Sequence, residues 1–210
     1  QTQHFPAYPN LGQLLTPEVK NGWGIVLVRE GHATEHTRGR IPGSVFKLLR
    51  SKKTYNFLLE VVAQCLGLWR FGDRFKGSYW SFVDNVGARF ALTRGYSKDP
   101  DANAIISLFW LTVLDLDAAP WFEHVPSAAQ LADAVSRADY TAADRDGWIE
   151  WHADLGPIWE IINVAVSCEA PITFALARQL MERCEHIRRR SAPIAVGRDG
   201  RWLPTPSGRG

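Results

Sequence analysis

The pattern of hydrophobic and polar positions first predicts a β-hairpin. Gly22–Glu30 is rich in apolar and β-branched side chains and is bounded by glycine, which is typical of a strand. Gly31–His32 predicts a turn, and the alternating residues Ala33–Arg40 predict the returning strand. A shorter apolar run at Leu11–Leu15 predicts another strand ahead of the hairpin.

Helical spacing of apolar residues follows the hairpin. A long helix is predicted over residues 53–71, with one broad apolar face formed by Phe57, Leu58, Val61, Val62, Cys65, Leu68 and Trp69. A short helix at Val86–Arg94 should end at Gly95, and a second long helix should cover Asp101–Leu116.

Two further strands complete an α/β pattern. Ser78–Asn85 and Trp121–Val125 are short and hydrophobic, and Pro126–Arg137 reads as a loop that runs into a short helix. The alternation predicts an α/β domain over residues 1–137. Residues 138–210 are expected to form a helical extension, strongest at Ile172–Arg188, with a basic C-terminal tail.

Composition narrows the class of protein. The apolar fraction of 46% and the charged fraction of 22% are those of a folded chain and exclude a disordered or low-complexity one. The longest apolar stretches, such as Ile105–Leu114, are too short for a membrane span. The chain begins at Gln1 rather than Met, which indicates a processed protein or an excised domain.

Charge and cysteine usage bear on partners and compartment. Residues 183–210 hold seven arginines and two acids, whereas the rest of the chain carries 17 basic and 20 acidic side chains. Such a tail suits phosphate or an acidic surface, and a solvated terminus is the alternative. Three cysteines without a CxxC pair favour a reducing compartment, and the histidines form no zinc pattern. We expect an intracellular protein, either organellar after loss of a targeting segment or nuclear.

Three acidic residues lie at positions from which their carboxylates could bind a metal ion. Asp84 ends a strand, Glu60 is the one acid within the apolar run Phe57–Ala63, and Asp133 opens a short helix. Carboxylates from such positions can converge on Mg²⁺, which prefers oxygen ligands. For each acid taken alone, a helix cap or a surface salt bridge is the favoured interpretation, and only the three together favour a metal site.

Short motifs in chain order carry a resemblance to a known family. They comprise residues 22–27 (GWGIVL), 58–60 (LLE), 82–85 (FVDN) with 92–97 (LTRGYS), and 125–127 (VPS) with 130–133 (QLAD) and 136–137 (SR). Together they resemble the ribonuclease H domain that follows the reverse transcriptase of long-terminal-repeat and tyrosine-recombinase retroelements. The resemblance covers about residues 11–137. It implies a mixed five-stranded sheet flanked by helices.

The resemblance also implies a site. Glu60, Asp84 and Asp133 would be catalytic residues that hold two Mg²⁺ ions, and an RNA–DNA hybrid would be the substrate. Contacts to nucleic acid would come from other residues of the same motifs and their surroundings: Asn85, Arg94, Lys98 and Arg137.

The first catalytic Asp of the family is missing. The chain has no Asp before Asp73, and alignment to Gly22 places the expected acid at Thr16 or Pro17. Glu18 could serve as a fourth metal ligand only if the strand shifts by one residue. Because the first acid bridges both metals, its loss predicts an impaired active site.

Two functions therefore stay open. The first is a degenerate domain that acts as a binding or structural subunit of a larger assembly, either through structured RNA or through protein partners of residues 138–210. That extension carries Trp148, Trp151, Trp159 and Trp202, which are typical of interface anchors but could equally pack the extension onto the domain. The second is an active Mg²⁺-dependent endoribonuclease that cleaves the RNA strand of hybrids.

Overall fold

The computed structural model of the chain describes most of the expected α/β domain. The described residues are 22–50, 55–151, 155–167, 172–176, 178, 179, 182, 193–196 and 202–203. The predicted strand Leu11–Leu15, Glu18 and most of the predicted helix Ile172–Arg188 lie outside the described residues, as do the side chains of the basic tail and of Trp202.

The predicted hairpin is confirmed. Strand β1 (Gly22–Arg29) pairs antiparallel with β2 (His32–Arg40), and Gly22 lies opposite Arg40. The two-residue turn has positive φ at Glu30 (51°) and Gly31 (79°), the geometry that matches the twist of a tight hairpin.

The described strands form two sheets. The first has the order β1-β2-β5-β6-β7, in which β5 (Ile149–Trp151) is parallel to β2, whereas β6 (Pro193–Val196) and β7 (Trp202–Leu203) continue antiparallel. The second is a parallel pair of β3 (Gly77–Val83) and β4 (Ala118–His124). A mixed sheet flanked by helices is therefore correct. The expectation of one sheet that joins the hairpin to the strands before Asp84 and around Trp121 is not met among these residues.

Helices form where the sequence places caps and apolar faces. Helix α3 (Asn56–Phe71) buries the predicted face, α4 (Val86–Arg94) is capped by the Asn85 side chain and closed by Gly95 at φ 75°, and α5 (Pro100–Asp115) begins at Asp99. The remaining helical elements are α2 (Gly43–Phe46), η1 (Gly72–Arg74), η2 (Ser127–Ala129), α6 (Leu131–Ser136), α7 (Thr141–Asp146) and α8 (Gly156–Ser167).

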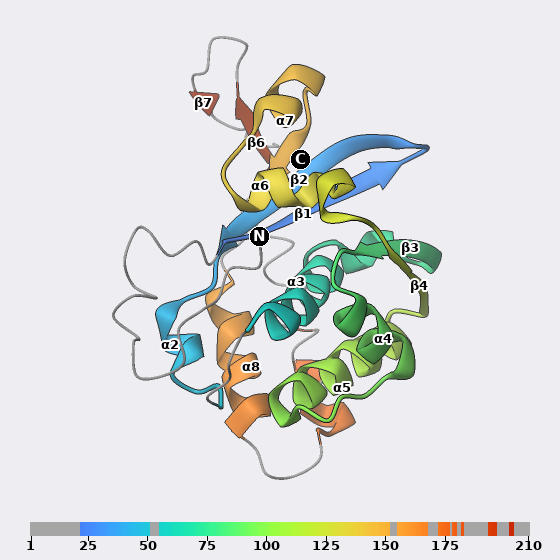
Figure 1. The fold of residues 1–210 in the computed structure, drawn as a ribbon, viewed down its shortest axis with the longest axis vertical. Coiled ribbons are helices and arrows are strands. Elements are labelled where there is room, and N and C mark those ends of the chain that lie inside the picture. The colour runs from blue at the N-terminus through green and yellow to red at the C-terminus, as the bar shows by residue number, and fades with distance from the viewer. Residues whose placement is uncertain are drawn as a thin grey trace, which may run out of the picture.

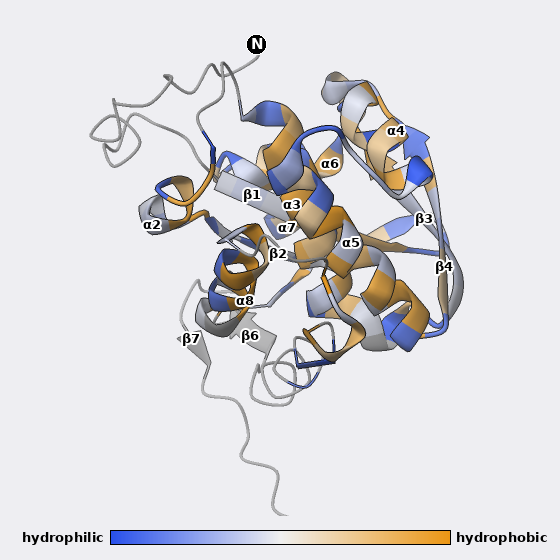
Figure 2. Ribbon diagram, turned by 90° about the horizontal axis from the view of Figure 1, so that it is seen from below, coloured by the Kyte–Doolittle hydropathy of each residue, from blue (hydrophilic) through white to orange (hydrophobic). Residues whose placement is uncertain are grey.

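Helix α3 lies at the centre of the molecule. It lies between the β1–β2 hairpin and α5, and α6 covers the other face of the hairpin (Figure 1). The apolar sides of α3, α5 and α8 face one another (Figure 2). Inside this core, the Trp69 indole Nε1 donates a hydrogen bond of 3.2 Å to the Thr112 hydroxyl, which satisfies the buried N–H group.

Helix α8 was not the helix expected to be strongest after Arg137, yet it belongs to the main core. Ile158, Trp159 and Ile162 are buried in the same cluster as α3 and α5. Residues on both sides of Arg137 therefore share one core, and the division of the chain at Arg137 stays a prediction. Trp148 and Trp151 are half-buried, so the described tryptophans of the extension pack largely inward.

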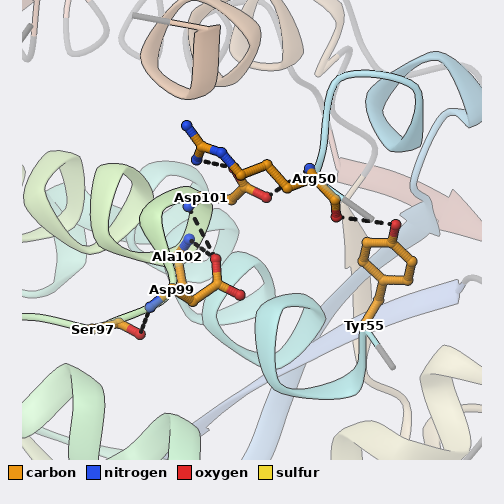
Figure 3. Close-up of polar contacts among 6 residues, drawn as sticks. All are labelled: Arg50, Tyr55, Ser97, Asp99, Asp101 and Ala102. Atoms are coloured by element: carbon orange, nitrogen blue, oxygen red, sulfur yellow. Dashed lines mark hydrogen bonds and ion pairs between the residues drawn. The ribbon is translucent and has the colours of Figure 1, made fainter. Parts of the chain in front are cut away.

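An ion pair between the exposed Arg50 and the buried Asp101 fixes the loop after α2 to the start of α5. Asp101 is fully buried and accepts hydrogen bonds from the Arg50 backbone N–H (2.9 Å) and guanidinium (2.8 Å) (Figure 3). Asp99 caps the same helix by accepting from the backbone N–H groups of Asp101 and Ala102. The contacts of Asp101 join Arg50, at the end of the loop after α2, to the first turn of α5.

One sheet face keeps its aromatic side chains exposed. Trp80 and Trp121 are opposite each other on β3 and β4, are 63% and 61% exposed, and have ring centroids 6.1 Å apart. Pro120 lies within β4 and cannot donate a backbone hydrogen bond, which fits a strand at a sheet edge. Within the described part of the chain, no helix has the length and hydropathy to cross a bilayer.

Candidate functional site

The first candidate acid, Glu60, lies on α3 in an apolar setting. Its neighbours Leu58, Val61 and Val62 are buried, and the Glu60 side chain itself is half-buried. A carboxylate in this position is costly unless a proton or a cation neutralises it.

Asp84 directly follows β3, and the segment after β4 forms hydrogen bonds with this end of the strand. The Ser127 hydroxyl donates to Asp84 Oδ2 (3.0 Å), and the Gln130 side-chain amide donates to the Phe82 carbonyl (3.2 Å). Sequence reasoning did not assign either contact. The sequence signal that could have pointed to Ser127 and Gln130 is their position just after Val125–Pro126, in the same motif as Asp133.

Asp133 is positioned by the close approach of α6 to β1. A Cβ atom at Gly24 would lie 2.7 Å from both the Ala132 carbonyl oxygen and the Ser136 backbone nitrogen, so only glycine leaves room for the helix. The first turn of α6 carries Asp133. The glycines of the Gly-Trp-Gly segment thus have a structural role, which is to let this helix lie directly on the strand.

The structure brings the three acids together. Glu60 forms a side-chain hydrogen bond with Asp84, and the Asp133 charge acts on it as well. Burial raises the pKa of Glu60 to about 8, and the charge of Asp84, its hydrogen bond and the charge of Asp133 add to this effect. At neutral pH and without a cation, Glu60 is therefore mostly protonated. The carboxyl groups of a helix interior, a strand end and a helix start therefore act on one another.

Carboxylate oxygens are suitable ligands for a hard divalent cation, but these three acids are not spaced to bind one. Within residues 22–50, 55–151 and the other described parts, no group of three or more His, Cys, Asp or Glu side chains is placed closely enough to hold a metal ion. Arg137 Nε also lies 2.9 Å from Asp133 Oδ1, an ion pair that sequence reasoning missed. A cation would have to displace that arginine and draw the carboxylates inward.

The residues expected to contact nucleic acid surround the acids in part. Arg94 and Lys98 are exposed, and Arg137 is half-exposed but paired with Asp133. The Asn85 side chain accepts from the Ala88 N–H (2.9 Å) as the cap of α4, which occupies its oxygen. The roles of these residues, like those of Glu60, Asp84 and Asp133 in catalysis, remain predictions.

Comparison of the chain with protein-family models, curated proteins and solved structures finds no match.

A glutamine at position 60 is expected to stabilise the protein in a pH-dependent way. In the folded protein the pKa of Glu60 is about 8, above the ordinary value of 4.5, so between these two pH values the folded state binds more protons than the unfolded state. The free energy of unfolding of the wild-type protein therefore falls as the pH rises from 4.5 to 8. Glu60→Gln keeps the neutral form. Its free energy of unfolding should exceed that of the wild type by about 1–2 kcal/mol at pH 8 and by much less at pH 4.5.

Urea unfolding at both pH values measures this difference. Glu123→Gln, a change at an exposed position on β4, is the matched control and should show no such dependence. A Glu60→Gln difference that is the same at pH 4.5 and pH 8 would contradict the proton-coupled role of Glu60.

Proposed function

We propose that the chain is a degenerate ribonuclease H-like domain that is catalytically impaired and serves as a binding or structural subunit of a larger assembly. The observation that carries the proposal is the meeting of Glu60, Asp84 and Asp133 from three separate elements. The resemblance would make these three acids metal ligands of a two-metal nuclease, while the sequence has no acid at Thr16 or Pro17, where the first one is expected.

The arrangement of the strands supports the same reading. The resemblance implies antiparallel strands first and parallel strands after them. The described chain has the antiparallel pair β1–β2 followed by the parallel pair β3–β4. Helix α3 contacts both β1 and β3, so one helix packs against both strand pairs. The expected first strand at Leu11–Leu15 falls outside the described residues.

The retained side chains define what chemistry the site can perform. Mg²⁺ bound here would polarise water and phosphate oxygens. Asp84 and Asp133 would supply carboxylate oxygens, while Glu60 would have to lose its proton before it could bind a cation. Arg137, released from Asp133, could then contact a phosphate group. This sequence of events makes cation binding compete with both a proton and an internal ion pair.

The same contacts explain why activity should be impaired. Ser127 occupies one oxygen of Asp84, and Arg137 occupies one of Asp133. The acid that bridges both metals in the family is absent from the aligned positions. With fewer ligands and more competition, two cations would not be held at the spacing that a two-metal displacement needs.

The binding role rests on exposed surface rather than on the extension alone. Trp148 and Trp151 pack inward, whereas Trp80 and Trp121 stand exposed on the β3–β4 face. Aromatic side chains exposed side by side are typical of interaction surfaces, which supports a chain that works with a partner.

The alternative is an active Mg²⁺-dependent endoribonuclease acting on RNA–DNA hybrids. The convergence of Glu60, Asp84 and Asp133 favours it, because a chain that had lost the activity entirely would have no chemical need for three adjoining acids. Glu18 would then have to supply the fourth carboxylate.

Cleavage of a labelled RNA–DNA hybrid in Mg²⁺ and in Mn²⁺ distinguishes the two functions. The wild-type chain is expected to show no cleavage above that of Asp84→Asn. Thr16→Asp or Pro17→Asp should restore cleavage by on the order of a hundredfold, because it returns a charged ligand to the metals. Cleavage by the wild type that Asp84→Asn abolishes would establish the alternative instead.

A further inference from the structure

A buried histidine joins β2 to a segment that follows Arg137. His36 on β2 is 3% exposed. Its ring stacks on Tyr140 and meets Trp148 edge-on, with both centroids 6.2 Å away. These two aromatic residues flank α7, which lies beside β2 (Figure 1). We call residues 140–151, which comprise α7 and β5, the docked segment.

The docked segment is held by a few polar contacts to neighbouring residues of β2. Within the described part of the chain, strand β5 pairs with β2 between residues 35–37 and 149–151. The Thr37 hydroxyl donates to the Trp151 carbonyl (2.7 Å), and Arg38 Nε donates to Glu150 Oε1 (2.8 Å). Arg38 also donates to the Tyr140 hydroxyl. His36 is the middle residue of this short pairing, the His36 seam, and lies opposite Glu150.

The environment of His36 favours the neutral imidazole over the charged imidazolium. His36 Nδ1 is buried and has no hydrogen-bond partner among the described residues. An imidazolium has an N–H donor on both nitrogens, so the charged ring would leave an unsatisfied donor and a desolvated charge in this site.

Charged neighbours act on His36 in both directions. Glu150 on β5 and Asp144 on α7 favour the charged form, Arg38 on its own strand opposes it, and the facing residue on β1 is the apolar Val26. Burial outweighs them and lowers the pKa of His36 below its ordinary value of 6.5.

We propose that the His36 seam is an acid-sensitive latch: protonation of His36 releases the docked segment from β2 and opens that edge of the sheet. In the released state the pKa of His36 returns to its ordinary value, whereas in the docked state burial keeps this pKa lower. Docking is therefore fully stable above about pH 6.5 and weakens as pH falls through the lowered pKa. The released edge of β2 and the rings of Trp148 and Trp151 become accessible to a partner strand. This inference does not depend on the proposed function.

Hydrogen–deuterium exchange of the full chain at pH 7.5 and pH 5.5 tests the latch. Rates are corrected with unfolded peptide for the intrinsic effect of pH on exchange. Protection of residues 140–151 should fall by on the order of tenfold at pH 5.5, while α3 and α5 keep theirs. Protection that does not change with pH, or that falls equally in α3 and α5, would overturn the proposal.

Two variants assign the effect to His36. His36→Phe keeps an aromatic ring but cannot take a proton, so protection of the docked segment should become independent of pH. His32→Gln, at an exposed position on the same strand, should behave as the wild type. A pH effect that survives in His36→Phe overturns the proposal.

A second measurement covers the case in which His36→Phe does not fold. NMR titration of the wild-type imidazole then decides. A His36 ring that takes its proton over the same pH range as the release supports the latch, and a ring still neutral after release overturns it.

Discussion

A chain truncated after Arg137 is expected to lose its cooperative fold. The truncation removes α8, which packs on α5 and whose residues Ile158, Trp159 and Ile162 are buried in the main core. It also removes β5, which covers the edge of β2. The apolar surface left on α5 and α3 would be exposed to water, and the loss of several fully buried side chains exceeds the few kcal/mol of net stability of an ordinary domain.

Thermal unfolding monitored by near-UV circular dichroism measures this outcome. Two point variants of the full chain grade the effect. Ile158→Ala, at a position 1% exposed, should cost about 2–5 kcal/mol, whereas Val164→Ala, at a position 53% exposed on the same helix, should change stability by less than about 0.5 kcal/mol. A truncated chain that unfolds cooperatively near the wild-type midpoint would mean that the core closes before Arg137.

The local elements were predictable because each depends on signals within a short stretch of sequence. The hairpin follows from the β-branched run of Gly22–Glu30 and the glycine turn, and α3 from apolar residues at helical spacing. Asn85 and Gly95 mark the ends of α4 as caps. In each case the residue types that favour the element are next to one another in the chain.

The association between distant elements was less predictable. The pairing of β5 with β2 depends on three residues at 149–151, a run too short to show a period. Helix α8 has the apolar face of a core helix, but nothing in its sequence says that this face meets α5 rather than a partner. The long-range placement of residues after Arg137 was therefore the part that sequence patterns left undecided.

The acid site shows the same division. Glu60, Asp84 and Asp133 could be selected because each stands at an exceptional place in its own element. That Glu60 and Asp84 share a hydrogen bond, and that Arg137 pairs with Asp133, depends on how α3, β3 and α6 meet in space. The Gly-Trp-Gly segment was recognised as part of a family motif, while its physical role appeared only from the closeness of α6 to β1.

Replacing Gly24 by alanine is expected to displace α6 and destabilise the fold by about 1–3 kcal/mol. The added methyl group would meet the Ala132 carbonyl oxygen and the Ser136 nitrogen at 2.7 Å. Both are backbone atoms that cannot rotate away, so the helix itself must move. Asp133 moves with it, and the pKa of Glu60 should fall because one neighbouring negative charge becomes more distant. Urea unfolding and an NMR titration of the Glu60 carboxyl carbon report the two effects.

Gly67→Ala is the matched control, at a position on α3 where this helix packs against Ile25 of β1. A Cβ at Gly67, on α3, would meet its nearest neighbour, Ile25 Cγ2, at 3.6 Å, which is an ordinary contact. Because alanine is favoured over glycine inside a helix, this variant should be unchanged or more stable by up to about 1 kcal/mol, with the titration of Glu60 unaltered. If Gly24→Ala destabilises the chain but leaves the pKa of Glu60 where it was, Asp133 is not positioned by the packing of α6 on β1. If both alanines have the same effect, the close approach at Gly24 is not what holds the helix in place.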